Sequence, residues 1–123
     1  MAGELQIVSR VYDLILWTLN HTSKFPRDHR FTLGTRLEDA LYGLLDDVLE
    51  AKFTQQKADI LRRAALRLEK IRFQFRLAKD LHIVALSSHR HACSLVDDIG
   101  RQVGAWRRSV ESTAARLEPG RKR

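Results

Sequence analysis

Apolar residues recur every three to four positions along four segments of the 123-residue chain. This spacing gathers apolar side chains on one face of an α-helix. The segments run from about 4 to 21, 28 to 52, 56 to 81 and 87 to 112, with short joins between them. Short joins favour antiparallel neighbours, so the pattern predicts an all-α fold, an antiparallel up-down-up-down four-helix bundle.

Each segment has a predicted core face. In the first segment the spacing selects Leu5, Val8, Tyr12, Ile15 and Leu19. In the second it selects Leu33, Leu37, Ala40, Leu41, Leu44 and Val48. In the third it selects Ile60, Leu61, Ala64, Leu68, Ile71, Phe75 and Ala78. In the fourth it selects Ala92, Leu95, Val96, Ile99, Val103, Trp106 and Val110.

The chain is predicted to be one domain with a short tail. Its length suits a single domain with a sizeable core, and 6 Gly and 2 Pro are too few for a turn-rich all-β fold. We assign residues 1–116 to the bundle. The remaining residues, 117–123, are predicted to form a basic disordered tail, because Pro119 and Gly120 end any helix.

The third segment carries a second apolar stripe. Leu66, Phe73 and Leu77 are spaced at i, i+7 and i+11, roughly opposite the predicted core face. Single apolar residues at a surface are ordinary, but three in a line, one of them aromatic, are typical of an interface. The stripe predicts self-association of the bundle.

The net charge of +7 is unevenly distributed. Residues 24–36 carry +3, 57–82 carry +5 and 101–123 carry +5, whereas 37–56 carry −4. A basic surface beside an acidic one suits a polyanionic partner, or an assembly in which acidic faces meet basic faces.

Arginine predominates among the cations of the third and fourth segments. Its planar guanidinium binds phosphate in a bidentate manner, so these residues favour a nucleic-acid-binding surface. Some of them are expected to pair with carboxylates instead. Affinity should be salt-sensitive and base specificity weak, since no groove-reading motif is present. The candidates are Arg62, Arg63, Arg67, Lys70, Arg72, Arg76, Lys79, Arg101, Arg107 and Arg108.

The stretch SKFPRDHRFTLG, residues 23–34, joins the first two segments. Pro26 can occupy the first turn of a helix, and Phe25 can pack against a later apolar residue. A simple junction does not explain cations at a helix N-terminus, where the macrodipole disfavours them. Two interpretations stay open, a junction alone or a junction with an anion-binding surface. Asp28 and Arg30 could also form structural ion pairs. The candidate cations are Lys24, Arg27 and Arg30.

The sequence offers no catalytic or metal-binding motif. The five histidines form no HxxxH pair and no zinc pattern with cysteine, and there is no phosphate-binding glycine loop or nucleophile elbow. Cys93 is predicted to be a small buried side chain. Asp46, Asp47 and Glu50 could imitate the magnesium cluster of a helical nucleotide hydrolase, against a solvated or subunit-facing acidic surface. We predict no enzyme activity, no catalytic residue, no metal and no cofactor.

The predicted location is cytoplasmic. The single cysteine cannot form an internal disulfide, and the first residues do not resemble a signal peptide. The longest uncharged apolar run is far shorter than the roughly 20 residues that cross a bilayer, so no membrane association is expected.

Five motifs carry a resemblance to a known family. They are VYDLILW, KFPRDHRFTLGTRL, LLDDVLEAKF, LRLEKIRFQFRLAKDL and IGRQVGAWRRS, in this order over about Val8 to Ser109. The chain resembles the accessory variability determinant proteins of diversity-generating retroelements, and FPRDHRFTLG is the most specific part of the match. These proteins are related to the four-helix-bundle proteins encoded in intervening sequences of large-subunit ribosomal RNA genes.

The resemblance implies a basic four-helix bundle that assembles as a homopentameric barrel. It implies a protein that binds a reverse transcriptase and nucleic acid, RNA and DNA, and supports mutagenic cDNA synthesis and retrohoming without being the polymerase. The basic residues named above then become candidate contacts to nucleic acid or reverse transcriptase. The acidic second helix, together with Leu66, Phe73 and Leu77, becomes a candidate subunit interface. The alternative is an RNA-associated bundle of the ribosomal intervening-sequence type with no reverse transcriptase partner.

Overall fold

The computed structural model describes the backbone of residues 2–117 and the side chains of residues 6–117, and every regular element within this range is helical. Four helices are long and two elements are short. The long helices are α1 (Ala2–Thr22), α3 (Thr35–Phe53), α4 (Lys57–Asp80) and α5 (Leu86–Leu117). The short elements are the single turn α2 (Arg27–His29) and the π-helical turn η1 (Arg30–Gly34). The predicted all-α class and the four helices are confirmed.

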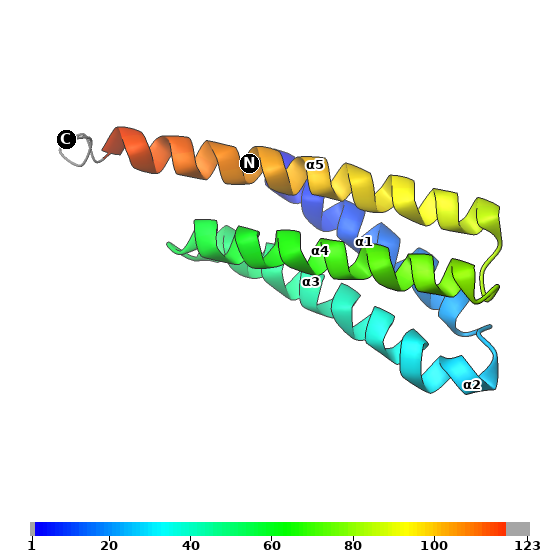
Figure 1. Cartoon of the computed structure of the whole chain (residues 1–123). Helices are drawn as coiled ribbons and strands as arrows, with labels where there is room; N and C mark the ends of the chain where they lie inside the picture. The colour runs from blue at the N-terminus through cyan, green and yellow to red at the C-terminus, as the bar shows by residue number, and fades with distance from the viewer. Residues whose placement is uncertain (1, 118–123) are drawn as a thin grey trace.

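Successive long helices run antiparallel (Figure 1). Both α1 and α4 pack against α3 and α5, so α1 and α4 are the diagonal pair of the bundle. The connection of residues 23–34 and the turn of residues 81–85 lie at one end, which we call the connection end. At the other end α5 projects beyond the other helices.

The core follows the predicted faces of three helices. All seven predicted residues of α4 are buried, as are five of the six predicted for the second segment. On α5 the predicted face is buried at Ala92, Val96, Ile99 and Val103.

The face predicted for α1 is right only in part. Ile15 is buried, and Val8 and Leu19 pack against the core, whereas Tyr12 is 56% exposed. The centre of the buried side runs through Ile7, Val11 and Leu14, and Leu5 lies outside the described side chains. The α1 sequence has two apolar stripes, and packing against α3 and α5 decides between them.

The junction stretch has a more complex backbone than the single helix predicted from Asp28. Pro26 is the extended N-cap residue of α2 (φ −54°, ψ 147°), one position before the predicted first turn. Phe25 is 6% exposed, and its ring lies 3.4 Å from where a Cβ on Gly34 would be. The predicted packing of Phe25 is therefore confirmed. Its ring packs against the last residue of the π-helical turn that precedes α3.

Helix α5 extends beyond its predicted end near residue 112 and continues to Leu117. The predicted tail from residue 118 onward lies outside the described residues. Leu117, which we had assigned to the tail, is the last helical residue.

Candidate nucleic-acid interface

Most candidate cations on α4 and α5 are paired with carboxylates. An ion pair within 4 Å engages eight of them. The paired residues are Arg62, Arg63, Arg67, Arg72, Arg76, Lys79, Arg101 and Arg107. Pairing balances much of their charge locally, so the excess of +7 is carried by other residues.

Three of these arginines tie α4 to its neighbours. The buried carboxylate of Asp47 on α3, 1% exposed, accepts from Arg63 Nε at 2.9 Å and from Arg67 Nε at 2.8 Å. The absent side chain of Gly43 makes room, since a Cβ there would collide with the Arg67 guanidinium. Arg72 in turn reaches Asp97 on α5. These pairs are structural links between helices.

The hydrogen bonds also raise the pKa of two of these guanidiniums, Arg63 and Arg72. Those to Asp47 and then Glu50 raise the pKa of Arg63. Burial lowers the pKa of Arg72, but hydrogen bonds to Asp97 and Glu69 outweigh it and the pKa is raised. Both oxygens of Asp47 already accept hydrogen bonds from arginine. Asp47 is the middle residue of the suggested magnesium cluster, so it is not a free metal ligand in this structure. Among residues 6–117, no cluster of three or more potential metal ligands occurs.

Unpaired cations gather at the connection end. Lys24, Arg27, Arg30 and Arg36 are exposed, and no carboxylate of the described residues lies within 4 Å of them. We call these four residues the connection cluster. The suggested structural ion pairs of Asp28 and Arg30 do not form within the described part of the chain, so the described residues give the cluster no counter-ion within 4 Å.

An exposed aromatic ring completes this surface. Phe31 is 71% exposed, and the Arg30 guanidinium carbon lies 5.6 Å from its ring centroid. An exposed ring among unpaired cations can stack on a nucleic-acid base while the cations contact phosphates. Phe31 and Arg36 were not predicted as site residues from the sequence. The sequence feature that could have indicated them is an aromatic residue, Phe31, between the cations Arg30 and Arg36, in a stretch with little apolar periodicity.

Lys70 and Arg108, the other two candidates, have no carboxylate partner among the described residues and lie apart from the connection cluster. Lys70 interrupts the second stripe of α4, between Leu66 and Phe73. That stripe is at the surface, with Phe73 66% exposed. Its role as an interface stays a prediction.

A family model described as bAvd-like matches residues 5–110 of the chain. The chain belongs to the bAvd-like family. The predicted resemblance to accessory variability determinants is thereby confirmed, and this is a family of accessory, non-catalytic proteins of diversity-generating retroelements. The connection cluster lies inside the matched range. A comparison with curated proteins finds no match.

The cysteine of this bAvd-like chain sits beside a histidine without forming an activated pair. Cys93 Sγ lies 3.4 Å from His89 Nε2. Burial, followed by the charge of Asp97, raises the pKa of the Cys93 thiol, and burial lowers the pKa of His89. Both groups are therefore held neutral, the opposite of a thiolate–imidazolium nucleophile.

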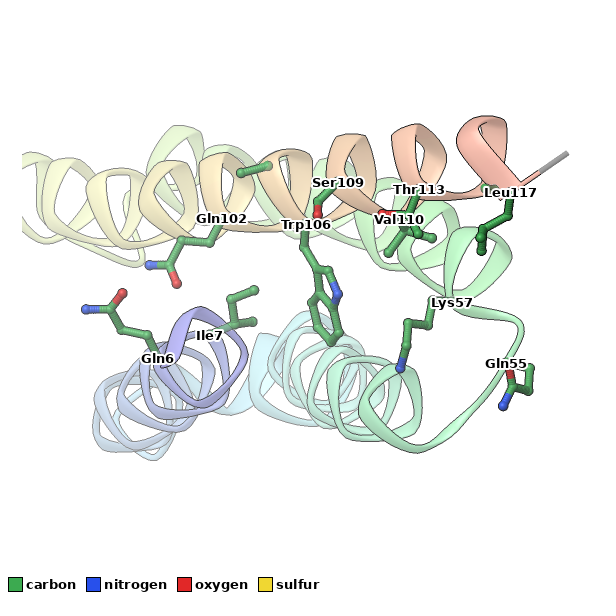
Figure 2. Close-up of a pocket in the computed structure, with 12 residues that line it drawn as sticks. Gln6, Ile7, Gln55, Lys57, Gln102, Trp106, Ser109, Val110, Thr113 and Leu117 are labelled. Carbon is green, nitrogen blue, oxygen red and sulfur yellow. The ribbon is translucent and has the colours of Figure 1, made fainter. Parts of the chain in front are cut away.

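A cavity of about 660 Å³ lies between α1, α5 and the start of α4 (Figure 2). Lys57, its one ionisable lining residue, donates from Nζ to the carbonyls of Ala51 at 2.6 Å and Lys52 at 3.2 Å. Its ammonium, 6.0 Å from the Trp106 ring, thus stabilises the end of α3.

Among the described helices, none combines the length and apolar character that a membrane span requires.

Proposed function

We propose that this bAvd-like protein is the accessory protein of a diversity-generating retroelement. It binds the reverse transcriptase and nucleic acid, RNA and DNA, and so supports mutagenic cDNA synthesis and retrohoming. It works in the cytoplasm as a homo-oligomer, a pentamer in the family's manner, without enzymatic activity of its own. The family match over residues 5–110 carries this proposal.

Nucleic-acid binding is assigned first to the connection cluster. The paired arginines of α4 and α5 have carboxylates to neutralise them, whereas the four cluster cations have none within 4 Å among residues 6–117. Arg30 lies in the turn before α3 and Arg36 in the first turn of α3, where the macrodipole makes an additional positive charge unfavourable. A phosphate backbone would relieve both costs, and bases would stack on Phe31 with little sequence preference.

The candidate cations of α4 and α5 fall into two groups, those whose ion pairs join two helices and those whose ion pairs lie within one helix. Arg63, Arg67 and Arg72 link helices, and their release would break hydrogen bonds to Asp47 and Asp97. Arg62, Arg76 and Arg101 are highly exposed and pair with carboxylates of their own helix. Exposed pairs of this kind are weak, so these three side chains can exchange partners. We assign them to the reverse transcriptase, together with Lys79, Arg107, Lys70 and Arg108.

Charge reversal tests the nucleic-acid surface. The triple variant Arg27→Glu, Arg30→Glu and Arg36→Glu should bind single-stranded RNA and DNA about 100-fold more weakly than wild type at low salt. The slope of log affinity against log salt should fall by about 2 to 3, because three phosphate contacts are lost. Fluorescence anisotropy with labelled oligonucleotides at several salt concentrations measures both quantities.

The matched control changes the same charge elsewhere. Arg62→Glu, Arg76→Glu and Arg101→Glu replace three exposed arginines outside the connection end. This variant should keep most of its affinity. Equal losses in the two triple variants, or wild-type affinity in the first, would contradict the assignment to the connection cluster.

The alternative function, an RNA-associated bundle without a reverse transcriptase partner, is supported by the same cluster. Oligonucleotide binding does not distinguish the two functions. Recovery of a reverse transcriptase with the protein does.

A further inference from the structure

The stretch from Arg27 to Phe53 is one continuous helical path. The single turn α2, the π-helical turn η1 and helix α3 follow one another without an intervening residue. The backbone at Arg30 (φ −64°, ψ −42°) and Gly34 (φ −58°, ψ −48°) stays in the right-handed helical region. A π-helical turn pairs residues five apart, whereas an α-helical turn pairs residues four apart. The path therefore contains one residue more than an uninterrupted α-helix with the same number of turns.

This extra residue changes the direction of the arginines that precede it. The buried side of α3 is centred near Leu37, because Leu41 and Leu44 lie within about 40° of it around the helix. In an uninterrupted α-helix Arg30, seven residues before Leu37, would project about 20° from this centre, and Arg27 about 80°. The wider turn takes up one residue, so the two arginines project about 120° and 180° from the centre instead. Both are exposed, as this outer position requires.

The buried side of the turn is filled by apolar groups. Leu33 is 8% exposed, and Phe25, 6% exposed, lies with its ring 3.4 Å from where a Cβ on Gly34 would be. An uninterrupted helix would direct Arg30 toward this side. Burying a guanidinium without a partner is costly, so the sequence satisfies both Leu33 and Arg30 by widening the turn.

The outer side of the turn carries the nucleic-acid contacts of the proposed function. Phe31 is 71% exposed, and the Arg30 guanidinium carbon lies 5.6 Å from its ring centroid. Arg27, three residues before Arg30, projects about 60° from it around the helix. The turn thus presents two unpaired guanidiniums and one ring on the same side of the path.

We propose that the π-helical turn is a positioning element for nucleic-acid binding. Its extra residue sets the angle at which Arg27 and Arg30 leave the bundle. Phe25 and Gly34 are positioning residues, since both are buried and act on the nucleic acid only by holding the turn. The inference deepens the proposed function and rests on nucleic-acid binding by the connection cluster.

Two changes of chain length test the positioning. An alanine inserted between Thr32 and Leu33 turns Arg27 and Arg30 back toward the buried side by about 100°. Affinity for single-stranded RNA should fall by about 10-fold at low salt, and the slope of log affinity against log salt by about 1 to 2, because these phosphate contacts are lost. Deletion of Thr32 instead gives an uninterrupted α-helix with both arginines at their present angles. Its affinity, measured by the same fluorescence anisotropy, should stay within about 2-fold of wild type.

An exchange of neighbouring residues separates positioning from stability. Arg27→Asp with Asp28→Arg, and Arg30→Phe with Phe31→Arg, keep the composition and the net charge but move each guanidinium by one residue. In the inserted chain this exchange returns the guanidiniums to about 120° and 180°, so affinity and salt slope should recover. At wild-type length the same exchange should not raise the affinity. A merely structural role of the turn would not produce this recovery.

The outcomes distinguish the inference from the proposed function. Circular dichroism and urea unfolding show whether each variant is folded. Wild-type affinity in the inserted chain, no recovery on exchange, or lost affinity in a folded deletion variant would each overturn the inference. The deletion of Thr32, an exposed residue, decides alone if the inserted chain does not fold. A wild-type protein that binds no nucleic acid would overturn the proposed function and the inference with it.

Discussion

Replacing Phe25 by alanine is expected to lower the free energy of unfolding by about 3 to 5 kcal/mol. Phe25 is 6% exposed, and its ring packs on the backbone of Gly34. Removal of the ring leaves a cavity beside the π-helical turn. The start of α3 then loses its packing contact with residue 25. Urea unfolding followed by circular dichroism measures the change. The urea concentration at the unfolding midpoint should fall, while the dependence of the free energy of unfolding on urea concentration should change little.

Phe31→Ala is the matched control, since it removes the same ring from the same stretch. Phe31 is exposed, so the free energy of unfolding should change by no more than about 0.5 kcal/mol. Affinity for single-stranded RNA should instead fall by about 5-fold to 100-fold, the cost of one lost stacking contact. If Phe25→Ala were as stable as Phe31→Ala, the stretch would not hold the junction together.

The second large effect is expected at the buried ion pair between α3 and α4. Arg67→Met keeps an apolar stem but leaves one oxygen of the buried Asp47 carboxylate without its donor. The expected loss is about 1.5 to 3 kcal/mol of unfolding free energy, typical of a buried hydrogen bond to a charged group. Thermal and urea unfolding measure it.

A double-mutant cycle isolates this pair. In an Asp47→Ala background the same Arg67→Met change should cost less than about 0.5 kcal/mol, because its partner is gone. Arg62→Met provides an exposed comparison, since the pair of Arg62 with Asp59 lies in solvent on one helix. If Arg67→Met cost no more than Arg62→Met, Asp47 would not be a structural link.

The helices and most of the core could be predicted from apolar spacing because α3, α4 and α5 each have one dominant buried face. In α4 the two stripes were separated correctly, since one has seven members and the other three. In α1 the two stripes are of similar strength. The buried one includes Thr18, a polar residue that lowers its apparent apolar character. The predicted face therefore includes the exposed Tyr12 beside the buried Ile15.

The candidate site could be predicted only in part. Charge counts locate the basic segments, but a count does not tell a free arginine from one that reaches across to another helix. Whether Arg67 is free depends on Asp47, twenty positions earlier, and on the space above Gly43. Phe25 and Phe31 lie in the same motif, and only the π-helical turn decides that one ring is buried and the other exposed.

The central claim is that this bAvd-like protein works with a reverse transcriptase and its template RNA. Affinity purification of the tagged protein from its native host at moderate salt, with identification of every retained polypeptide and nucleic acid, tests it most directly. The account predicts recovery of a reverse transcriptase together with a template RNA. Recovery of ribosomal RNA alone, or of no partner, would contradict it.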